Sequence, residues 1–374
     1  MRFLKLDTGV IDTFDQALAG AVEVVATSPG KPLARLARHR GWSRALGVQA
    51  RALVAPGAEA RQLIAGNMAR KRIRLPEIFG NPFVAGLYSY IKRVQAAVLK
   101  EALLAELAAS DPEVVIVYNG SSYPESVLEA ASRGRPRVFI EAGFFPKTLQ
   151  VDPKGLNGAN SVPRDPAFYL ETEEDFAAPG LPEFVNNRPS KSKYDPVELT
   201  PGYVFVPFQV PSDMQVTQHS PWIRDMEQFL EQVCAAADRN PDDTFVIKEH
   251  PSFKRSVIGW REHPRVIFAN GNVTSDLIRD ARAVITLNST VGIEGLLLGK
   301  PVITLGHACY NIDGLVQHAP DAASLDAALA ARDWAPDERL RRQVLGYLWN
   351  RYLVHGSYAE LPADLAETLK ARAA

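Results

Sequence analysis

The sequence is poor in cysteine and has no long apolar run. Cys234 and Cys309 are its only cysteines and form no CxxC pair, so a cysteine zinc site is not expected. Two free thiols in a reducing compartment are favoured, with a disulfide as the alternative. No stretch of about 18 apolar residues occurs, so no membrane-spanning helix is expected. The apolar start of the chain is short and broken by charge, unlike a signal peptide, which favours a cytoplasmic protein.

Several motifs that bind phosphates, metals or acyl groups are also missing. The chain has no early GxGxxG, no P-loop, no GxSxG and no HExxH. It has no DxD triplet of the metal-holding kind, and Asp242-Asp243 is expected in a turn before a strand. We therefore expect a site without a metal ion and without a cofactor. The formal net charge of −1 gives no overall attraction to nucleic acid, which is not an expected partner.

The second half of the sequence alternates short apolar runs with helical patterns. Expected strands cover residues 202–207, 244–248, 266–269, 283–287 and 301–305. Expected helices cover residues 221–239, 273–280 and 291–298, and helical pattern dominates from about residue 325 onward. This alternation is typical of a parallel sheet with helices on both faces.

The first half is less regular but contains one clear strand, helix and strand. The strands 114–118 and 137–141 flank a helix at 124–133, at the spacing of a right-handed βαβ unit. Helices are also expected at 57–70 and 84–109. A polar segment from 152 to about 201 is long for a loop, so the domain boundary is placed near its end.

The sequence thus predicts an α/β protein with two Rossmann-like domains that face a cleft. The expected domains are residues 1–198 and residues 199–345, with C-terminal helices at 346–374 that pack back on the first domain. Ligands of such sheets bind outside the carboxyl ends of the strands, so polar residues just after strands are the site candidates.

Two carboxylates meet this criterion, each with an alternative interpretation. Glu141 ends a strand before Gly143 and two phenylalanines, and burial there would suit a general acid or base. A plain surface glutamate is the alternative. Asp213 lies in the loop after residues 202–207, where a helix-capping role is the alternative. Ser220 is expected to cap the helix 221–239, which would leave Asp213 for other work.

The segment KEHP follows the strand 244–248. Lys248 supplies a positive charge, and His250 supplies a donor whose direction Pro251 helps to fix, because proline restricts the turn. A cation and an imidazole at a strand end would suit a phosphate, although a lone histidine is more often structural.

The segment LNSTVGIEG follows the strand 283–287. Asn288, Ser289 and Thr290 can cap the next helix, whose free N–H groups attract anions. Glu294, one turn further, is at the reach for a ribose hydroxyl. A plain helix cap is the alternative, but KEHP in the same domain favours a phosphate-binding site.

At this point the chain resembles a known family. The segments EAGFFP with the later GLN, VPFQVPSDMQVTQHSP, KEHP, LNSTVGIEGLLLGKPVITLG and HGSY occur in this order between about residues 137 and 358. They resemble bacterial GT-B sialyltransferases that use CMP sugars, and more closely the capsule-synthesis family, which holds retaining β-Kdo transferases. The first 110 residues show no matching motif.

The resemblance implies a GT-B fold, CMP-β-Kdo as donor, and a double displacement through a covalent glycosyl-enzyme. By motif, Asp213 resembles the nucleophile and Glu141 the acid/base. In retaining glycosidases such carboxylates lie about 5–5.5 Å apart. The implied donor ligands are Lys248, His250, Pro251, Asn288, Ser289, Thr290 and Glu294. Further candidate acceptor or donor contacts are Gln209, Gln215, Asn157 and Lys147. The implied partners are a CMP sugar and a saccharide or glycolipid acceptor in capsule or lipopolysaccharide assembly.

Other interpretations stay open. An inverting CMP-sugar transferase would share the nucleotide site but need no nucleophile. A non-catalytic carbohydrate-binding or assembly protein is a third hypothesis. The basic run at 69–76, close to Phe79 and Phe83, could contact anionic lipid or an acidic acceptor, which would place the protein peripherally on the membrane. A solvated helix end is the alternative there.

Overall fold

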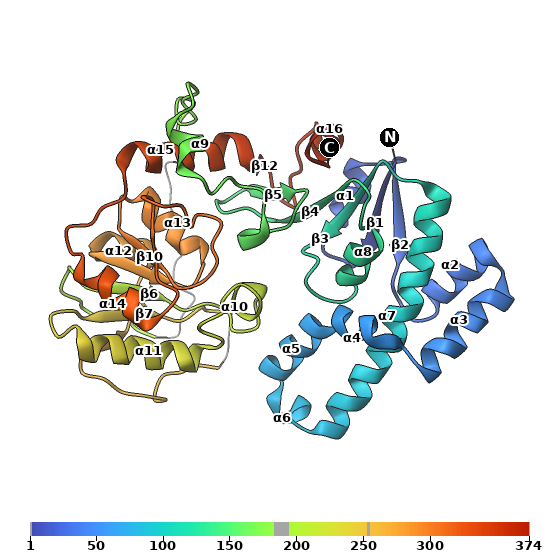
Figure 1. Ribbon diagram of the computed structural model, residues 1–374, viewed down its shortest axis with the longest axis horizontal. Helices are drawn as coiled ribbons and strands as arrows, with labels where there is room; N and C mark the ends of the chain where they lie inside the picture. The colour runs from blue at the N-terminus through green and yellow to red at the C-terminus, as the bar shows by residue number, and fades with distance from the viewer. Residues whose placement is uncertain (1, 183–193, 253–254, 374) are drawn as a thin grey trace. The chain divides into compact units, whose positions relative to one another are not determined.

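The computed structural model describes residues 2–182, 194–252 and 255–373. The chain divides into two compact units. Unit 1 is Met1–Gly143, Lys147–Ser161 and Val354–Ala374, and unit 2 is Phe144–Pro146 and Val162–Leu353. Each unit contains one six-stranded sheet, so the predicted α/β class with two Rossmann-like sheets is confirmed (Figure 1). The cleft between them stays a prediction.

The sheet of unit 1 is mixed, in the order β12-β5-β4-β3-β1-β2. Strands β2, β1, β3 and β4 are parallel, whereas β5 runs antiparallel to both β4 and β12. The strands are β1 (Phe3–Asp7), β2 (Val22–Ala26), β3 (Val114–Tyr118), β4 (Arg137–Ala142), β5 (Thr148–Asp152) and β12 (Val354–His355). The helices are α1 (Thr13–Ala17), α2 (Lys31–Arg40), α3 (Trp42–Val54), α4 (Gly57–Leu63), α5 (Ala65–Arg74), α6 (Pro76–Phe79), α7 (Pro82–Ser110), α8 (Glu125–Ala131), the 3-10 turn η1 (Asn157–Ala159) and α16 (Leu365–Ala373).

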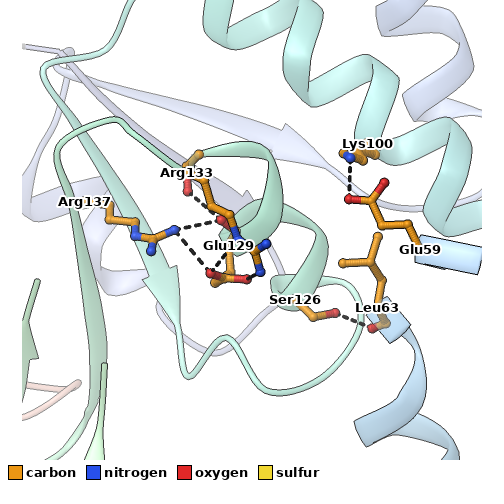
Figure 2. A network of polar contacts seen from close by, with 8 residues as sticks. Glu59, Leu63, Lys100, Ser126, Glu129, Arg133 and Arg137 are labelled. Atoms are coloured by element: carbon orange, nitrogen blue, oxygen red, sulfur yellow. Dashed lines mark hydrogen bonds and ion pairs between the residues drawn. The ribbon is translucent and has the colours of Figure 1, made fainter. Parts of the chain in front are cut away.

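The long helix α7 organises the helical part of unit 1. Asn81 caps its start, because Oδ1 accepts from the N–H groups of Phe83 and Val84, and Pro82 fits its first turn. Lys100 on α7 pairs with Glu59 on α4, with Nζ 2.5 Å from Oε1 (Figure 2). The helices α2, α3, α4 and α6 all pack on α7.

Helix α8 is attached to the neighbouring elements by side-chain bonds. The Ser126 hydroxyl donates to the Leu63 carbonyl at the end of α4 across 2.6 Å (Figure 2). Glu129 receives ion pairs from Arg133 and from Arg137, the first residue of β4. Elements around the carboxyl end of β3 are therefore fixed to the helical part of the unit.

The sheet of unit 2 is entirely parallel, in the order β11-β10-β9-β6-β7-β8. The strands are β6 (Val204–Pro207), β7 (Phe245–Lys248), β8 (Val266–Phe268), β9 (Ala283–Thr286), β10 (Val302–Thr304) and β11 (Gln317–His318). The helices are α9 (Pro166–Leu170), α10 (Met214–Thr217), α11 (Met226–Arg239), α12 (Thr274–Asp280), α13 (Thr290–Leu297), α14 (Ala322–Ala330), α15 (Glu338–Tyr347) and the π-helix η2 (Leu348–Tyr352). This order is that of a doubly wound dinucleotide fold, with the switch point between β6 and β9.

The division of the chain differs from the predicted boundaries. Residues 162–182 belong to unit 2, because Tyr169 and Phe176 pack in its core with Leu340 on α15. The Gln343 amide donates to the carbonyls of Tyr169 and Glu174. The chain returns to unit 1 at residue 354, not near 346, and α16 packs on the unit 1 sheet. Residues 183–193 of the expected long loop lie outside the described residues.

Two predicted helices are corrected. The helix expected at 221–239 begins at Met226, because Asp225 caps it by accepting from the Gln228 N–H across 2.7 Å. The Ser220 hydroxyl instead donates to the Ile223 carbonyl within the preceding loop. The helix expected at 57–70 is two helices, α4 and α5.

No disulfide joins Cys234 and Cys309, which are both buried. Within residues 2–182, 194–252 and 255–373, no helix combines the length and apolarity needed to cross a bilayer.

Candidate functional site

The candidate site in unit 2 lies at the switch point between β6 and β9. The loop after β6 begins with Phe208 and Gln209, and the loop after β9 is formed by Leu287, Asn288 and Ser289. Gln209 Nε2 donates to Asn288 Oδ1 across 3.0 Å, and Gln209 Oε1 accepts from the Asn288 N–H across 3.3 Å. Both side chains are buried, so this pair fixes the two loops together.

Asn288 also holds the chain that follows α10. Its amide donates to the carbonyls of Gln215 (2.9 Å) and His219 (3.1 Å), and its side chain is only 2% exposed. A Cβ atom on Gly306 would lie 2.8 Å from the His219 carbonyl oxygen, so glycine permits this close approach. The side-chain amide of Asn288 thus donates to two backbone carbonyls and accepts from Gln209. In this arrangement Asn288 and Gln209 are positioning residues.

Asp213 is the N-cap of the short helix α10. Its Oδ1 accepts from the Gln215 N–H across 3.0 Å, whereas Oδ2 has no hydrogen bond to the described part of the chain. The side chain is exposed at the carboxyl end of β6. The capping alternative is therefore observed, and it leaves one carboxylate oxygen toward solvent.

The His219 imidazole lies near this carboxylate, and the His307 imidazole lies near His219. Burial lowers the pKa of His219, and His307 lowers it further against the opposing charge of Asp213. His219 Nε2 is buried without a hydrogen bond to any described residue. His307 is held by its backbone, whose N–H donates to the His219 carbonyl across 2.7 Å. Burial therefore favours the neutral form of the imidazole that lies near Asp213.

The N-terminus of α13 is built around Ser289. Its Oγ caps the helix by accepting from the Val291 N–H across 3.2 Å, and its own N–H donates to Thr286 Oγ1. The buried Tyr310 hydroxyl donates to the Ser289 carbonyl, and burial raises the pKa of that hydroxyl well above its usual value. Ser289 and Thr290 remain partly exposed at the positive end of the helix, a place that suits an anion.

A glycine in this motif is required by packing. A Cβ atom on Gly292 would lie 2.3 Å from the Tyr310 hydroxyl and 2.8 Å from Cζ of the same ring. Glu294 is half-buried two residues further along α13.

Lys248, at the end of β7, forms hydrogen bonds with the loop after β8. Its ammonium donates to the carbonyls of Asn270 (3.1 Å) and Asn272, and burial lowers its pKa. The predicted donor-phosphate ligand is thus engaged with backbone oxygens in this structure, which gives it a positioning role.

The rest of KEHP is ordered by Glu249. Its carboxylate accepts from Asn270 Nδ2 (2.8 Å), from the Ser256 hydroxyl and from the Val257 N–H (2.7 Å). His250 is exposed, and its Nδ1 accepts from the Ser252 N–H across 3.1 Å, which places the proton of the neutral ring on Nε2. Pro251 is exposed beside it.

The candidate site in unit 1 centres on Glu141 in β4. Asn119 Nδ2 donates to Oε1 (3.1 Å), and Asn157 Nδ2 donates to Oε2 (3.3 Å). The amide groups of Gln150 and Asn157 bond to one another, and Gln150 Nε2 also donates to the Ala142 carbonyl. Two side-chain amides from separate segments therefore orient a half-buried carboxylate at the carboxyl end of β4, and Gln150 holds one of them, Asn157, in place.

Asn157 owes its position to Asp152. The buried Asp152 carboxylate accepts from the N–H groups of Lys154, Gly155 and Ser161, and from the Ser161 hydroxyl. These bonds shape the turn that carries Asn157, whose φ of 54° lies in the left-handed region that asparagine tolerates. Lys147 is far less constrained, since its exposed ammonium lies 3.8 Å from the exposed Glu360 carboxylate.

Two tyrosines complete this site. Tyr118 and Tyr358 have ring centroids 6.2 Å apart, and burial followed by the Glu141 charge raises the pKa of Tyr118. Burial also raises the pKa of Tyr358, with Tyr118 and Glu141 adding to the effect. Glu141 and Asp213 belong to different units, so their separation stays a prediction.

The model of the family described as capsule polysaccharide biosynthesis protein matches residues 187–358. Protein FixF of Sinorhizobium fredii is 56% identical over 372 residues, which are 99% of this chain and 92% of that protein. The capsule polysaccharide export protein KpsS of Escherichia coli is 30% identical over 63% of this chain and 76% of its own length. The chain belongs to the capsule polysaccharide biosynthesis family.

Among solved structures, this member of the capsule polysaccharide biosynthesis family is similar to "Thermosulfurimonas dismutans KpsC, beta Kdo 2,7 transferase". The TM-score is 0.49 and the identity 17%, with 99% of this chain and 98% of that chain covered. In the described part of the chain, no group of three or more His, Cys, Asp or Glu side chains could hold a metal ion. The metal-independent site stays a prediction.

Sequence reasoning missed several residues of this family member's site. Asn119 directly follows the strand 114–118, so the strand-end rule that found Glu141 could have found it. The HGSY segment was recognised as similar to the family, but no local pattern places its Tyr358 beside Glu141. That placement depends on β12 pairing with β5, where His355 lies opposite Thr148.

Proposed function

We propose that this chain is a retaining glycosyltransferase that moves Kdo from CMP-β-Kdo to a saccharide or glycolipid acceptor in capsule or lipopolysaccharide assembly. One observation carries this proposal. At the switch point, Gln209 and Asn288 join the loop that contains Asp213 to the loop before the N-terminus of α13. A carboxylate is thereby held on the same sheet edge as a helix end that suits an anion. That edge is where a nucleotide phosphate and its sugar would lie.

In the first step, Asp213 Oδ2 attacks the anomeric carbon of Kdo. The bond from that carbon to the phosphate oxygen breaks, and its electron pair leaves with CMP. Ser289, Thr290 and the N–H groups of α13 would stabilise the phosphate of the departing CMP, and His250 would donate to it from Nε2. Lys248 would act on the donor by holding the loops after β7 and β8 in place.

In the second step, an acceptor hydroxyl oxygen attacks the same carbon from the face that CMP left. Glu141 takes the hydroxyl proton, and the electron pair of the ester bond returns to Asp213. Asn119 and Asn157 orient the Glu141 carboxylate for this role. Two inversions give net retention, and no cofactor takes part.

The cap bond of Asp213 favours one alternative. Because Oδ1 already satisfies the Gln215 N–H, Asp213 has a structural role that needs no covalent chemistry. An inverting transferase that uses the same CMP-sugar site and Glu141 as its single base is therefore the second candidate.

Intact mass spectrometry of the protein mixed with CMP-Kdo and no acceptor tests the proposal. The wild type should gain the mass of one Kdo molecule less one water, and Asp213→Asn, which keeps a capping oxygen, should gain nothing. Asp225→Asn is the matched control, since Asp225 caps α11 in the same way and lies outside the proposed chemistry. Adduct formation by Asp213→Asn would refute the nucleophile.

Glu141→Gln separates the two steps. The retaining proposal expects this variant to keep the adduct even when acceptor is present, with transfer slowed about 10²–10⁴-fold. Glu129→Gln is the control on the same unit. If neither the wild type nor Glu141→Gln forms an adduct and the product is inverted, the inverting alternative holds. If CMP-Kdo is never consumed with any saccharide acceptor, the transferase proposal fails.

A further inference from the structure

The basic side chains of this protein are concentrated in one part of unit 1. Residues 31–95 contain 13 Lys and Arg against two acidic residues, Glu59 and Glu77. The remainder of the chain carries 29 basic and 41 acidic side chains, although the whole chain has a net charge of only −1. The helices α2 to α6 and the first half of α7 thus form a strongly cationic segment in a chain that is otherwise acidic.

Exposed apolar side chains are concentrated in the same segment. The structure leaves 17 large apolar side chains exposed among the described residues, and 11 of them lie between residues 42 and 91. The 11 are Trp42, Leu46, Leu53, Val54, Leu75, Ile78, Phe83, Val84, Leu87, Tyr90 and Ile91. Val54 is 87% exposed and Phe83 is 77% exposed, far more than scattered surface residues require.

These apolar side chains follow the helical repeat. Phe83, Leu87 and Ile91 are spaced four residues apart and form one stripe along α7. Leu53 belongs to α3, and its carbonyl accepts from the Tyr90 hydroxyl across 2.5 Å, which brings the end of α3 to α7. In Figure 1 the helices α3 and α6 lie beside the first half of α7, and α5 leads into α6.

Cations border this apolar surface. Arg61 and Arg72 are exposed on α4 and α5, and neither has an ion pair within the described residues. Lys71 lies 5.9 Å from the ring centres of both Phe79 and Tyr88. A groove of about 480 Å³ between these helices and α7 is lined by Arg61 and Arg72 together with Ile64, Met68, Pro82 and Ala85. Guanidinium groups beside an apolar groove are complementary to a phospholipid, whose phosphate headgroup lies next to its acyl chains.

We propose that the helices α3 to α7 form a docking surface for a bilayer that carries anionic phospholipids. The cations attract the headgroups, and Ile78, Phe83 and Leu87 insert at the boundary of the acyl chains. Nucleic acid offers the same negative charge but nothing that would bury these aliphatic side chains, so the lipid surface is the better match. The proposal is independent of the sugar chemistry, because it uses none of the residues assigned to catalysis.

Vesicle flotation with the full-length protein tests this surface. The wild type should bind phosphatidylglycerol-containing vesicles, bind pure phosphatidylcholine vesicles weakly, and lose affinity as salt is raised. Arg72→Glu should weaken binding at least about fivefold, since each cation near an anionic surface contributes on the order of that factor. Phe83→Ser should also weaken vesicle binding, and the ratio of its affinity to that of the wild type should not change with salt concentration.

Matched controls exist on unit 2. Arg342→Glu alters an exposed arginine and Trp260→Ser an exposed aromatic residue, 62% exposed, outside the cationic segment. Both should bind vesicles like the wild type, and thermal unfolding should show that all four variants are folded. Equal vesicle binding by Arg72→Glu and Arg342→Glu would overturn the proposal. So would the absence of vesicle binding by a wild type that binds DNA through these residues.

Discussion

Gln209 Nε2 donates to Asn288 Oδ1 across 3.0 Å, and this bond joins the loops that follow β6 and β9. The two strands are neighbours in the sheet, yet their pairing alone leaves the loops beyond them free to separate. The buried amide pair, extended by Asn288 to the Gln215 and His219 carbonyls, sets the path of the chain around Asp213.

Replacing Asn288 should disturb both stability and donor binding. Asn288→Ala leaves the buried Gln209 amide and two backbone carbonyls without partners, which should lower the free energy of unfolding by about 2–4 kcal/mol. Chemical denaturation measures this loss, and titration with CMP should show weaker binding.

Asn350→Ala is the matched control. The Asn350 amide also donates to two carbonyls of unit 2, those of Phe176 and Gly180, but it lies far along the chain from both loops. Its replacement should lower stability while leaving CMP affinity unchanged. Equal losses of CMP affinity in both variants would show that the effect of Asn288 is not local.

Gly292→Ala should destabilise unit 2, because the new methyl group would overlap the Tyr310 ring and hydroxyl. Overpacking of this kind costs about 1–3 kcal/mol, and the bond from Tyr310 to the Ser289 carbonyl would be displaced. Thermal unfolding tests the expectation. Gly47→Ala on α3 is the comparison, since its Cβ meets only Arg51 Nη1 at 3.8 Å, and it should stabilise by about 0.5–1 kcal/mol. A neutral Gly292→Ala variant would mean that Tyr310 can move.

Glu125 should make the protein less stable as pH rises. Burial raises the pKa of this carboxyl to about 8, against bonds from Tyr118 N–H and Thr8 and the charge of Lys5. Between its ordinary pKa near 4.5 and about 8, the unfolded chain loses a proton that the folded protein keeps. The free energy of unfolding should therefore fall through this interval, by an amount of order a few kcal/mol, and level off above it.

Glu125→Gln should remove that part of the slope. Denaturation at several pH values would show the variant gaining stability over the wild type as pH rises toward 8. Glu101→Gln, a partly exposed carboxyl paired with Arg40, should follow the wild-type curve. Parallel curves for Glu125→Gln and the wild type would contradict a buried, protonated Glu125.

Lys248→Met should act first on stability. The ammonium crosslinks two carbonyls of the loop after β8, and its loss should lower the free energy of unfolding by about 1–3 kcal/mol. Lys300→Met removes a bond to the single carbonyl of Ala281 and should have a smaller effect. Denaturation compares the two. An unchanged stability of Lys248→Met with abolished CMP binding would instead identify Lys248 as a direct donor ligand.

Local patterns predicted most elements of the unit 2 sheet. The strands 244–248 and 283–287 are confirmed as β7 and β9, because each is a short apolar run closed by polar residues. The edge strand β12 and the antiparallel β5 were not predicted, since each depends on a partner elsewhere in the chain. The misplaced domain boundary has the same cause: Tyr169 and Phe176 join unit 2 through α15, which lies far along the sequence.

The candidate site shows a similar limit. Taking the polar residues that follow predicted strands as candidates led to Asp213, His250, Ser289 and Glu141. This was possible because the ends of parallel strands can be predicted from a single sequence. Whether Lys248 faces a ligand or a backbone carbonyl depends on the loop after β8, which no pattern around KEHP reveals. The sequence patterns indicated only one basic run, at 69–76, in the cationic segment. That the segment extends over residues 31–95 became clear only from the packing of its helices in the structure.

The return of the chain to unit 1 at residue 354 has a consequence for biosynthesis. Leu365 and Leu369 of α16 pack in the same apolar cluster as Phe3, Val114 and Ile140 of the first unit. A ribosome must therefore translate all of unit 2 before the last strand and the covering helix of unit 1 emerge. During this time the nascent first unit has an unpaired sheet edge and an exposed apolar face. Chaperones recognise surfaces of this kind. The second unit has its whole sheet in one continuous stretch, so it can finish folding while the first is still incomplete.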